Sequence, residues 1–293
     1  MKNADISVIV PIYNCEKFLA ECLNSLQSQS FGNIEILCVN DGSTDNSLKI
    51  MREYAKKDKR IKILNQKNQG QSVARNNAIK VAKGKYLAFI DADDYVNNCF
   101  LEELYSAAIA ENTDIAVGNI IRVKDGCKNE PILYYKKVQT AHETDDIFRL
   151  LDIPKNCYTC NRLYRRDFIM TNSLFFKESV IFEDVIWSTL AAYNAKKVVS
   201  VPKADYYYVY NESSSVNTTE ISPEKIKNRH DAFMFYNHFI FEHKIKAPVR
   251  WEKISKLHFC GLPLLKIKEV PGFLKRYYFC GLCVASVETK HNF

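Results

Sequence analysis

The chain has 293 residues, of which 47% are hydrophobic and 26% are charged, and its formal net charge is +7. These proportions are typical of a folded, soluble protein with one large domain, or with a main domain and an appendage. No stretch approaches the ~18 apolar residues that a membrane-spanning helix needs. The positive charge is modest and no nucleic-acid-binding module accompanies it, so the sequence argues against a nucleic-acid partner.

The first residues, MKNADISVIVPIYN, contain a short apolar run that Pro11 interrupts, with no small-residue cleavage site. This pattern predicts a first β-strand rather than a signal peptide, and therefore a cytoplasmic protein. The ten cysteines fall mostly within apolar patterns, where a reduced cysteine acts as a small hydrophobic residue. The two C-x-x-C pairs, at 157–160 and 280–283, lie too far apart for a common zinc module, so we expect neither a disulfide framework nor a metal or redox site there.

Short apolar runs alternate with helical patterns over the first 125 residues. We predict strands at 6–13, 34–41, 60–66 and 86–94, and helices at 18–26, 46–57 and 72–84. This alternation predicts a parallel sheet that helices cover on both faces. Such sheets bind ligands at the carboxyl ends of their strands, where the polar clusters PIYN, NDGSTD and DADD all fall.

The pattern changes in the second half of the chain. A helix at 100–112 leads to a strand at 114–124 and then to a hairpin turn at 125–130. From about 140 to 220 we predict mixed structure, with helices near 148–151 and after 184 and strands near 197–201 and 206–210. Beyond residue 222 the chain is rich in aromatic and basic residues, and we predict helix there and no internal repeat.

The segment YLAFIDADDYV ends an apolar run in three carboxylates, those of Asp91, Asp93 and Asp94. Asp-x-Asp at a strand end suits a hard divalent cation, which takes one or two carboxylates and completes its shell with water and phosphate oxygens. A helix cap would need fewer acids than this. From these residues alone, the aspartyl nucleophile of a phosphatase is the main chemical alternative.

Two further motifs fall at the same edge of the predicted sheet. In NDGSTDNS, Gly42 permits a tight turn and Asp45 can cap a helix, which leaves Asp41 free to accept a hydrogen bond from a nucleobase. In NQGQSVARNNA, Arg75 follows a helix start, a place suited to a phosphate or a neighbouring carboxylate. Taken alone, this arginine is more simply interpreted as a solvent-exposed residue.

Four motifs in this order, ISVIVPIYN, EILCVNDGSTDNS, NQGQSVARNNAI and YLAFIDADD, resemble those of the family 2 glycosyltransferases. The resemblance covers roughly the first 100 residues and thins after about residue 215. It implies an α/β fold of GT-A type, with a mostly parallel, Rossmann-like sheet flanked by helices. We therefore divide the chain into a catalytic domain, 1–220, with a nucleotide-sugar half (1–125) and an acceptor half (126–220), and a helical C-terminal extension, 221–293.

The resemblance also implies roles for residues on the donor side. Three residues would border the nucleotide, namely Pro11, Tyr13 and Glu16. Asp41 would hold the base, typically uracil, and Arg75 would lie beside the nucleotide. Asp91 would lie near the ribose, and Asp93 would hold the Mn²⁺ or Mg²⁺ ion that bridges the diphosphate. Asp94 is a weaker candidate.

On the acceptor side, VIFEDVIWS resembles the family's Glu-Asp pair, which makes Asp184 the catalytic base and Glu183 its neighbour. Without the resemblance, two acids at a helix start would be assigned to the helix dipole. The segment YYYVYNESSSV lacks the Arg or His that the family often carries there, which puts a phosphate-gripping cation in doubt. Ala78 and the segment 160–162 also depart from common family residues, at positions where we expect packing to change more than chemistry.

The implied reaction is an inverting transfer of a sugar from a donor such as UDP-galactose, UDP-glucose or a UDP-N-acetylhexosamine to a glycan hydroxyl. We expect a bacterial acceptor in lipooligosaccharide, capsule or another surface polysaccharide, lipid-linked at the inner membrane, with peripheral contact through the basic C-terminal segment. Two alternatives stay open. One is a nucleotidyltransferase on a related fold, and the other is a catalytically silent nucleotide-sugar-binding protein.

Overall fold

The computed structural model describes residues 4–124, 127–211, 222–248, 253–259, 262–270, 274–279 and 282–288, with backbone alone for 127–130 and the last four stretches. The chain forms two compact units, Met1–Ser222 and Pro223–Phe293. This boundary lies two residues beyond the one that the sequence predicts. None of the described helices is long and apolar enough to cross a membrane.

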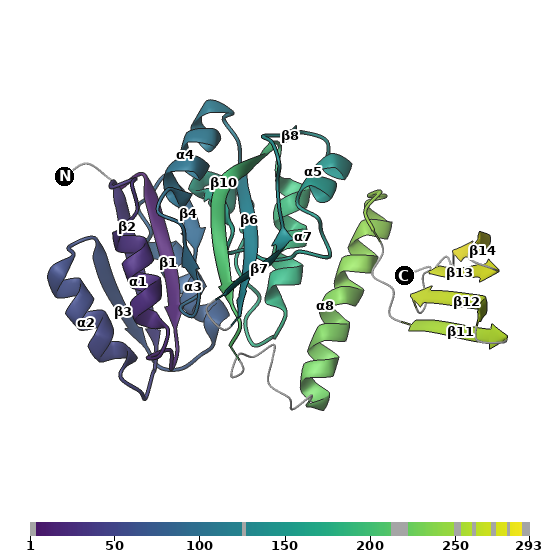
Figure 1. Cartoon of the computed structure of the whole chain (residues 1–293), viewed down its shortest axis with the longest axis horizontal. Helices are drawn as coiled ribbons and strands as arrows, with labels where there is room; N and C mark the ends of the chain where they lie inside the picture. The colour runs from purple at the N-terminus through teal and green to yellow at the C-terminus, as the bar shows by residue number, and fades with distance from the viewer. Residues whose placement is uncertain are drawn as a thin grey trace. The chain divides into compact units, whose positions relative to one another are not determined.

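A ten-stranded sheet forms the centre of the first unit (Figure 1). Its order is β3-β2-β1-β4-β9-β6-β10-β5, with β7 beside β6 and β8 beside β10. The strands are β1 (Ile6–Ile12), β2 (Ile34–Asp41), β3 (Ile61–Gln66), β4 (Tyr86–Phe89), β5 (Tyr95–Val96), β6 (Ile115–Lys124), β7 (Cys127–Leu133), β8 (Thr140–Ala141), β9 (Arg162–Arg165) and β10 (Val198–Val209).

The first four strands along the chain are parallel neighbours, as the alternating sequence pattern predicts. Beyond them the sheet is mixed: β9 runs antiparallel between β4 and β6, and β10 runs parallel to β6. The predicted hairpin is confirmed as β6 and β7. Strand β9 was not predicted, because four residues are too short to show a period of two.

Helices cover the sheet and are short, as expected for crossover connections. They are α1 (Leu19–Gln27), α2 (Ser47–Lys57), α3 (Gln71–Val81), α4 (Phe100–Ala110), α5 (Thr144–Leu150), α6 (Arg166–Thr171) and α7 (Glu183–Asn194). In α1 the buried residues recur at spacings of three and four: Leu19, Cys22, Leu23 and Leu26. That spacing places them on one helix face, which packs on the sheet.

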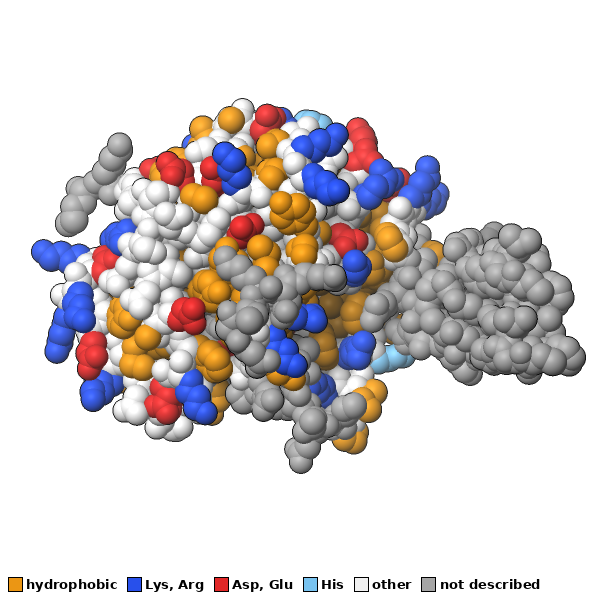
Figure 2. All heavy atoms as spheres, viewed as in Figure 1, with side chains coloured by type: hydrophobic (Ala, Val, Ile, Leu, Met, Phe, Trp, Pro, Cys, Tyr) orange, Lys and Arg blue, Asp and Glu red, His pale blue; other side chains and the backbone are white. Residues whose placement is uncertain are grey.

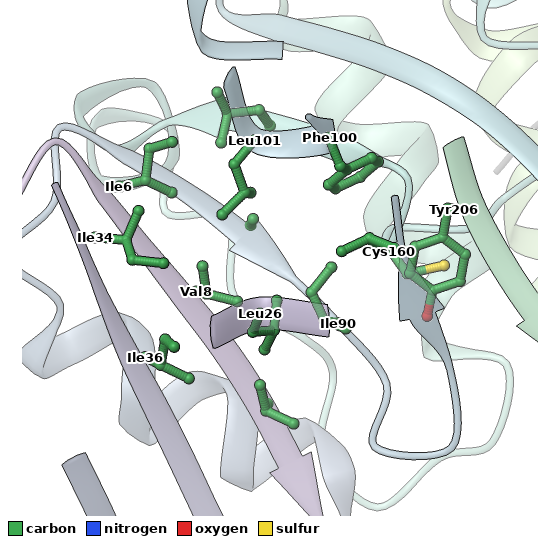
Figure 3. Packing of buried hydrophobic residues seen from close by; sticks show 14 of the residues in the cluster. Ile6, Val8, Leu26, Ile34, Ile36, Ile90, Phe100, Leu101, Cys160 and Tyr206 are labelled. Atoms are coloured by element: carbon green, nitrogen blue, oxygen red, sulfur yellow. The ribbon is translucent and has the colours of Figure 1, made fainter. Parts of the chain in front are cut away.

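Figure 3 shows part of the core beside β1 and β2. Ile6 and Val8 of β1 and Ile34 and Ile36 of β2 alternate along their strands and meet Leu26 of α1. Every residue of β2 is buried, because layers cover both faces of this part of the sheet. A rigid central sheet of this kind holds its strand ends in fixed positions, and the polar motifs follow those ends.

The second unit contains α8 (Pro223–Glu242) and a four-stranded antiparallel sheet. The strands follow in order as β11 (Lys253–Phe259), β12 (Leu262–Val270), β13 (Leu274–Phe279) and β14 (Leu282–Glu288). The helical prediction is thus confirmed for α8 and wrong beyond it. Short runs of β-branched and aromatic residues, divided by pairs containing glycine, favour strands over helix.

The expectation of no internal repeat was also wrong. The four letters FCGL occur at 259–262 and again at 279–282, twenty residues apart. Each copy spans the end of one strand and the start of the next, so β11–β12 and β13–β14 are two copies of one hairpin. The second copy contains Cys280, which lies outside the described residues, so the redox or metal reading of that C-x-x-C pair is not tested. In the first pair, Cys157 and Cys160 are buried, and the Cys157 thiol donates to the Pro154 carbonyl oxygen.

Charge is divided unequally between the two units. Residues 1–222 contain 28 Lys and Arg against 28 Asp and Glu, whereas residues 223–293 contain 13 against 6. The whole formal charge of +7 therefore belongs to the second unit. On the face drawn in Figure 2, acidic and basic side chains of the first unit are interspersed.

Candidate active site

Asp41, the last residue of β2, is buried and organises the loop that precedes α3. One carboxylate oxygen accepts hydrogen bonds from the Gln66 side chain (2.8 Å) and the Gln69 amide (2.9 Å), and the other accepts from the Gly70 amide (2.9 Å). Gly42 follows with φ of +72°, and a Cβ there would lie 2.7 Å from the Asn68 nitrogen. Only glycine fits this turn, as the sequence predicts.

Glu16 ties the loop after β1 to the loop after β2. Its Oε2 accepts hydrogen bonds from the Asn46 amide (2.9 Å) and side chain (2.8 Å), and its own amide donates to Asp45 (2.9 Å). Pro11 lies near the end of β1, and Tyr13 beyond it is 48% exposed. The residues that the resemblance assigns to the nucleotide border thus lie at the end of β1 and on the loop after it, which Glu16 braces against the loop after β2, and Tyr13 is open to solvent.

Arg75 joins three segments that are far apart in the sequence. Its guanidinium donates to Asp91 Oδ1 (2.7 Å) and to Glu183 Oε1 (2.9 Å), and it lies 5.1 Å from the centre of the Phe176 ring. The Arg75 side chain is 5% exposed and that of Glu183 is 2% exposed. The solvent-exposed interpretation of this arginine is therefore wrong. Arg75 instead connects α3 to the loop after β4 and to the start of α7.

The opposite charges in this ion-pair network stabilise one another. Burial alone would lower the pKa of Arg75, but Asp91 and Glu183 outweigh that effect and raise the pKa, so the guanidinium stays charged. The Nε of Arg75 and the Oε2 of Glu183 are buried without a hydrogen-bond partner among the described residues. Breaking a buried pair by removing one member leaves an uncompensated charge, which costs about 3–5 kcal/mol.

Asp93 lies in the turn after β4, beside Asp91. One of its oxygens accepts a hydrogen bond from the Asn211 side chain (3.1 Å). Burial and the negative charge of Asp91 raise the pKa of Asp93, so this turn would be stabilised by a cation. The described residues contain no group of three His, Cys, Asp or Glu side chains that could hold a metal alone. Two carboxylates that leave the remaining positions to water and phosphate nevertheless fit the coordination habits of Mg²⁺ and Mn²⁺.

Asp94 has a different environment from its two neighbours. It is buried, and its oxygens accept hydrogen bonds from the Tyr206 hydroxyl (2.5 Å) and the Val209 amide (2.8 Å). The Tyr206 oxygen also accepts from the Asp91 amide (3.3 Å). Asp94 and Tyr206 therefore fasten the acidic turn to the end of β10, which explains why Asp94 is the weaker candidate for metal binding.

Asp184 lies in the first turn of α7, next to Glu183. The preceding residue, Phe182, adopts a left-handed conformation with φ of 68°, which turns the chain into the helix. Asp184 accepts a hydrogen bond from the Val185 amide (2.9 Å). Burial and the charge of Glu183 raise the pKa of Asp184 to about 7, against the opposing effect of Arg75. A carboxylate with this pKa suits general base catalysis near neutral pH.

The structure thus gathers Asp41, Arg75, Asp91, Asp93, Glu183 and Asp184 on elements that meet around the carboxyl ends of β2 and β4. Sequence reasoning did not identify Gln71, whose side chain donates to Glu183 (2.6 Å), or the roles of Tyr206 and Asn211. Gln71 and Arg75 are four residues apart and share one face of α3, a signal that a helical pattern could have supplied. No local pattern marks Tyr206 or Asn211.

Comparisons with known proteins agree with these features. Residues 7–171, more than half of the chain, match the family model described as Glycosyl transferase family 2. The uncharacterized glycosyltransferase EpsJ of Bacillus subtilis (strain 168) is 34% identical over 244 residues, which are 80% of this chain and 70% of EpsJ. The poly(ribitol-phosphate) beta-glucosyltransferase of Bacillus spizizenii is 31% identical over 227 residues, 75% of this chain and 34% of that protein.

Among solved structures, the chain is similar to S. aureus TarS 1-349 in complex with UDP-GlcNAc. The TM-score is 0.69 at 26% identity, and the match covers 84% of this chain and 68% of that one. The chain spans 63–70% of the length of EpsJ and of two further curated relatives with the same 34% identity.

Proposed function

Because the chain belongs to glycosyl transferase family 2, we propose that it moves a sugar from a UDP-sugar to a hydroxyl of a glycan acceptor, with inversion at the anomeric carbon. The observation that carries this proposal is the network in which Arg75 bridges Asp91 and Glu183. It links the acidic turn after β4, on the donor side, to the acids that begin α7, on the acceptor side. Donor and acceptor groups would then be held in one fixed arrangement.

On the donor side, Asp41 and the loop it organises would receive the base, and Pro11, Tyr13 and Glu16 would border the nucleotide. Asp93, with Asp91 beside it, would hold Mn²⁺ or Mg²⁺, which when bound neutralises charge on the departing diphosphate. Burial and repulsion from Asp91 raise the pKa of Asp93, and a bound cation would relieve that repulsion, which supports this assignment.

On the acceptor side, Asp184 would take the proton from the attacking hydroxyl while Glu183 holds Arg75 in place. Asp184 has a pKa of about 7, so an appreciable fraction is ionised at neutral pH and the carboxylate is basic enough to accept a proton. One displacement on the face opposite the leaving group gives inversion. No second carboxylate is needed as a nucleophile.

The donor sugar and the acceptor belong to the same proposal. UDP-GlcNAc is the first donor to test, since it is the ligand in the TarS complex, and UDP-glucose is the second, from the name of the B. spizizenii relative. The acceptor would be a bacterial surface glycan. Peripheral contact with the inner membrane would fall to the second unit, which carries the net positive charge.

Nucleoside diphosphate release tests this function. The full chain is offered UDP-GlcNAc, UDP-glucose and UDP-galactose, with Mn²⁺, Mg²⁺ or EDTA and a panel of glycan acceptors. UDP release from one donor, lost in Asp93→Asn and Asp184→Asn and kept in the exposed control Asp146→Asn, would support the proposal. Pyrophosphate release would favour a nucleotidyltransferase. Donor binding without turnover of any acceptor would favour a silent binding protein, and no binding at all would overturn the assignment.

A further inference from the structure

The end of β6 carries two basic residues, and tyrosines occupy the end of β10 and the position that follows it. The two strands are parallel neighbours (Figure 1). Tyr208 is paired in register with Arg122. Residues two apart on a strand share a face, so Tyr210 follows Tyr208 and Lys124 follows Arg122 on that same face. The Lys124 Nζ lies 5.2 Å from the centre of the Tyr210 ring, which agrees with this placement.

The same face leads back to the candidate active site. Tyr206, two residues before Tyr208, reaches the acidic turn through its bond to Asp94. The ring of Tyr158 packs 6.0 Å from that of Tyr208, at an angle of 52°. The residue before Tyr158, Cys157, accepts a hydrogen bond at its carbonyl oxygen from Ser188 of α7 (2.7 Å), so Tyr158 lies beside the helix that begins with Glu183 and Asp184. A strip of tyrosines therefore runs outward from the acidic turn through Tyr206 and Tyr208 to Tyr210, with Tyr158 packed against Tyr208.

Some of the cations that surround the sheet are held by a neighbouring carboxylate. Arg60, Lys62, Arg165 and Lys197 each form an ion pair with an acid. Arg122 and Lys124 are exposed, and neither forms an ion pair with any residue whose side chain the structure describes. Two positive charges therefore lie at the end of β6, beside a site that is otherwise rich in carboxylates.

We propose that Tyr158, Tyr208, Arg122, Lys124 and Tyr210 form an acceptor subsite for an anionic glycan, one with a phosphate or carboxylate group near the accepting hydroxyl. Tyrosine rings offer flat apolar faces to sugar rings, and arginine forks bind phosphate and carboxylate oxygens. The strip lies at the ends of β6 and β10 and on the loop before β9, whereas the residues assigned to the donor lie at the ends of β1 and β2, on the loops after β1 and β4, and on α3. The assignment of the bound glycan as the acceptor rests on the proposed function. The inference that this glycan is negatively charged rests instead on Arg122 and Lys124.

Binding of defined polymers to the full chain tests this subsite. The probes are poly(ribitol phosphate), an oligogalacturonate and a neutral maltooligosaccharide, and affinity is measured by calorimetry at low and moderate salt. We expect at least one charged probe to bind about tenfold or more tightly than the neutral one. The phosphate and carboxylate probes then distinguish the two anions.

The variant Arg122→Gln/Lys124→Gln should weaken the charged probe about tenfold to a hundredfold and leave UDP-sugar binding unchanged. Both side chains are exposed, so the fold should be retained. A matched control, Lys227→Gln/Arg229→Gln, removes the same charge from exposed positions of α8. The subsite would be overturned if the control variant lost as much affinity for the charged probe as the Arg122/Lys124 variant, or if the Arg122/Lys124 variant bound that probe as tightly as the natural chain. It would also be overturned if the natural chain bound the neutral probe as tightly as the charged ones.

Failure of the proposed function is a separate result, because it is the absence of UDP-sugar binding. If no donor binds while charged glycans still depend on Arg122 and Lys124, the anionic subsite stands and the transferase assignment falls. If a donor is turned over while charged glycans bind no better than neutral ones, the transferase assignment stands and the anionic subsite falls.

Discussion

The acids at or just after the ends of β1 and β2 differ from the acids after β4 and at the start of α7. Asp41 and Glu16 accept several hydrogen bonds from backbone amides and amide side chains, which fix the loops around the site. Asp93 and Asp184 instead have raised pKa values, and Glu183 keeps one oxygen without a partner among the described residues. Carboxylates that look alike in the sequence thus have two different roles. Some hold the loops of the site in place, whereas others can still bind a ligand or a proton.

Asp184→Asn should give the largest effect, and it tests whether this acid belongs to the reactive group. Loss of a general base should lower kcat by about 10²- to 10⁴-fold. The stability of the Asp184→Asn variant, in contrast, should increase. The pKa of Asp184 rises from 3.8 in the unfolded chain to about 7 in the fold, so its ionised form destabilises the fold increasingly as pH rises from about 4 to 7. At pH 8 the Asn variant should therefore unfold at a higher temperature than the natural chain, and a lower Tm together with full activity would place Asp184 among the structural acids.

Arg75→Gln should have the next largest effect, on stability. It leaves Asp91 and Glu183 without their shared cation, and for buried Glu183 we expect a cost of about 3–5 kcal/mol in the free energy of unfolding. Urea denaturation followed by circular dichroism measures this. Arg60→Gln, at a partly exposed pair with Asp58, is the control and should cost about 1 kcal/mol or less. Equal losses would mean that the Arg75 network is no more than a surface pair.

Tyr206→Phe sharpens the contrast between Asp94 and its neighbours. It removes the hydroxyl that bonds both Asp94 and the Asp91 amide, which should cost about 1–3 kcal/mol because Asp94 is buried. If the hydroxyl fixes the acidic turn, Mn²⁺-dependent binding of UDP should also weaken, as measured by calorimetry. Tyr207→Phe, on the neighbouring residue, is the control for the loss of a hydroxyl. Unchanged nucleotide binding in Tyr206→Phe would limit Asp94 and Tyr206 to a purely structural role.

The smallest effect that we predict is a shift in the pH profile. Activity should rise as pH increases through about 7, because Asp184 must lose its proton to act as a base. Glu183→Gln removes the neighbouring negative charge that helps to raise this pKa, so the midpoint should move to lower pH. The dependence of kcat on pH in the two proteins measures the shift. A shift to higher pH would show that loss of the contact with Arg75 outweighs the loss of charge.

Much of the first unit could be predicted from the sequence. Strands β1 to β4 and helices α1 to α4 follow from residue periodicity, and Asp41, Asp91 and Asp93 follow from their position after apolar strands. These features are local, since each depends on a window of about ten residues and on the rule that parallel strands present their carboxyl ends at one edge. The repeated FCGL hairpin is likewise visible in the sequence, at 259–262 and 279–282.

The tertiary structure decided which of these residues meet. Arg75 and Glu183 are 108 residues apart and Tyr206 and Asp94 are 112 apart, yet each pair shares a hydrogen bond. Strand β9 enters the sheet antiparallel, and the strip beside Arg122 exists only because β10 returns in register with β6. Local patterns determine the elements and their polar ends. Packing over the whole chain determines which charges are buried together, and this burial raises the pKa of Asp184 and keeps Arg75 paired.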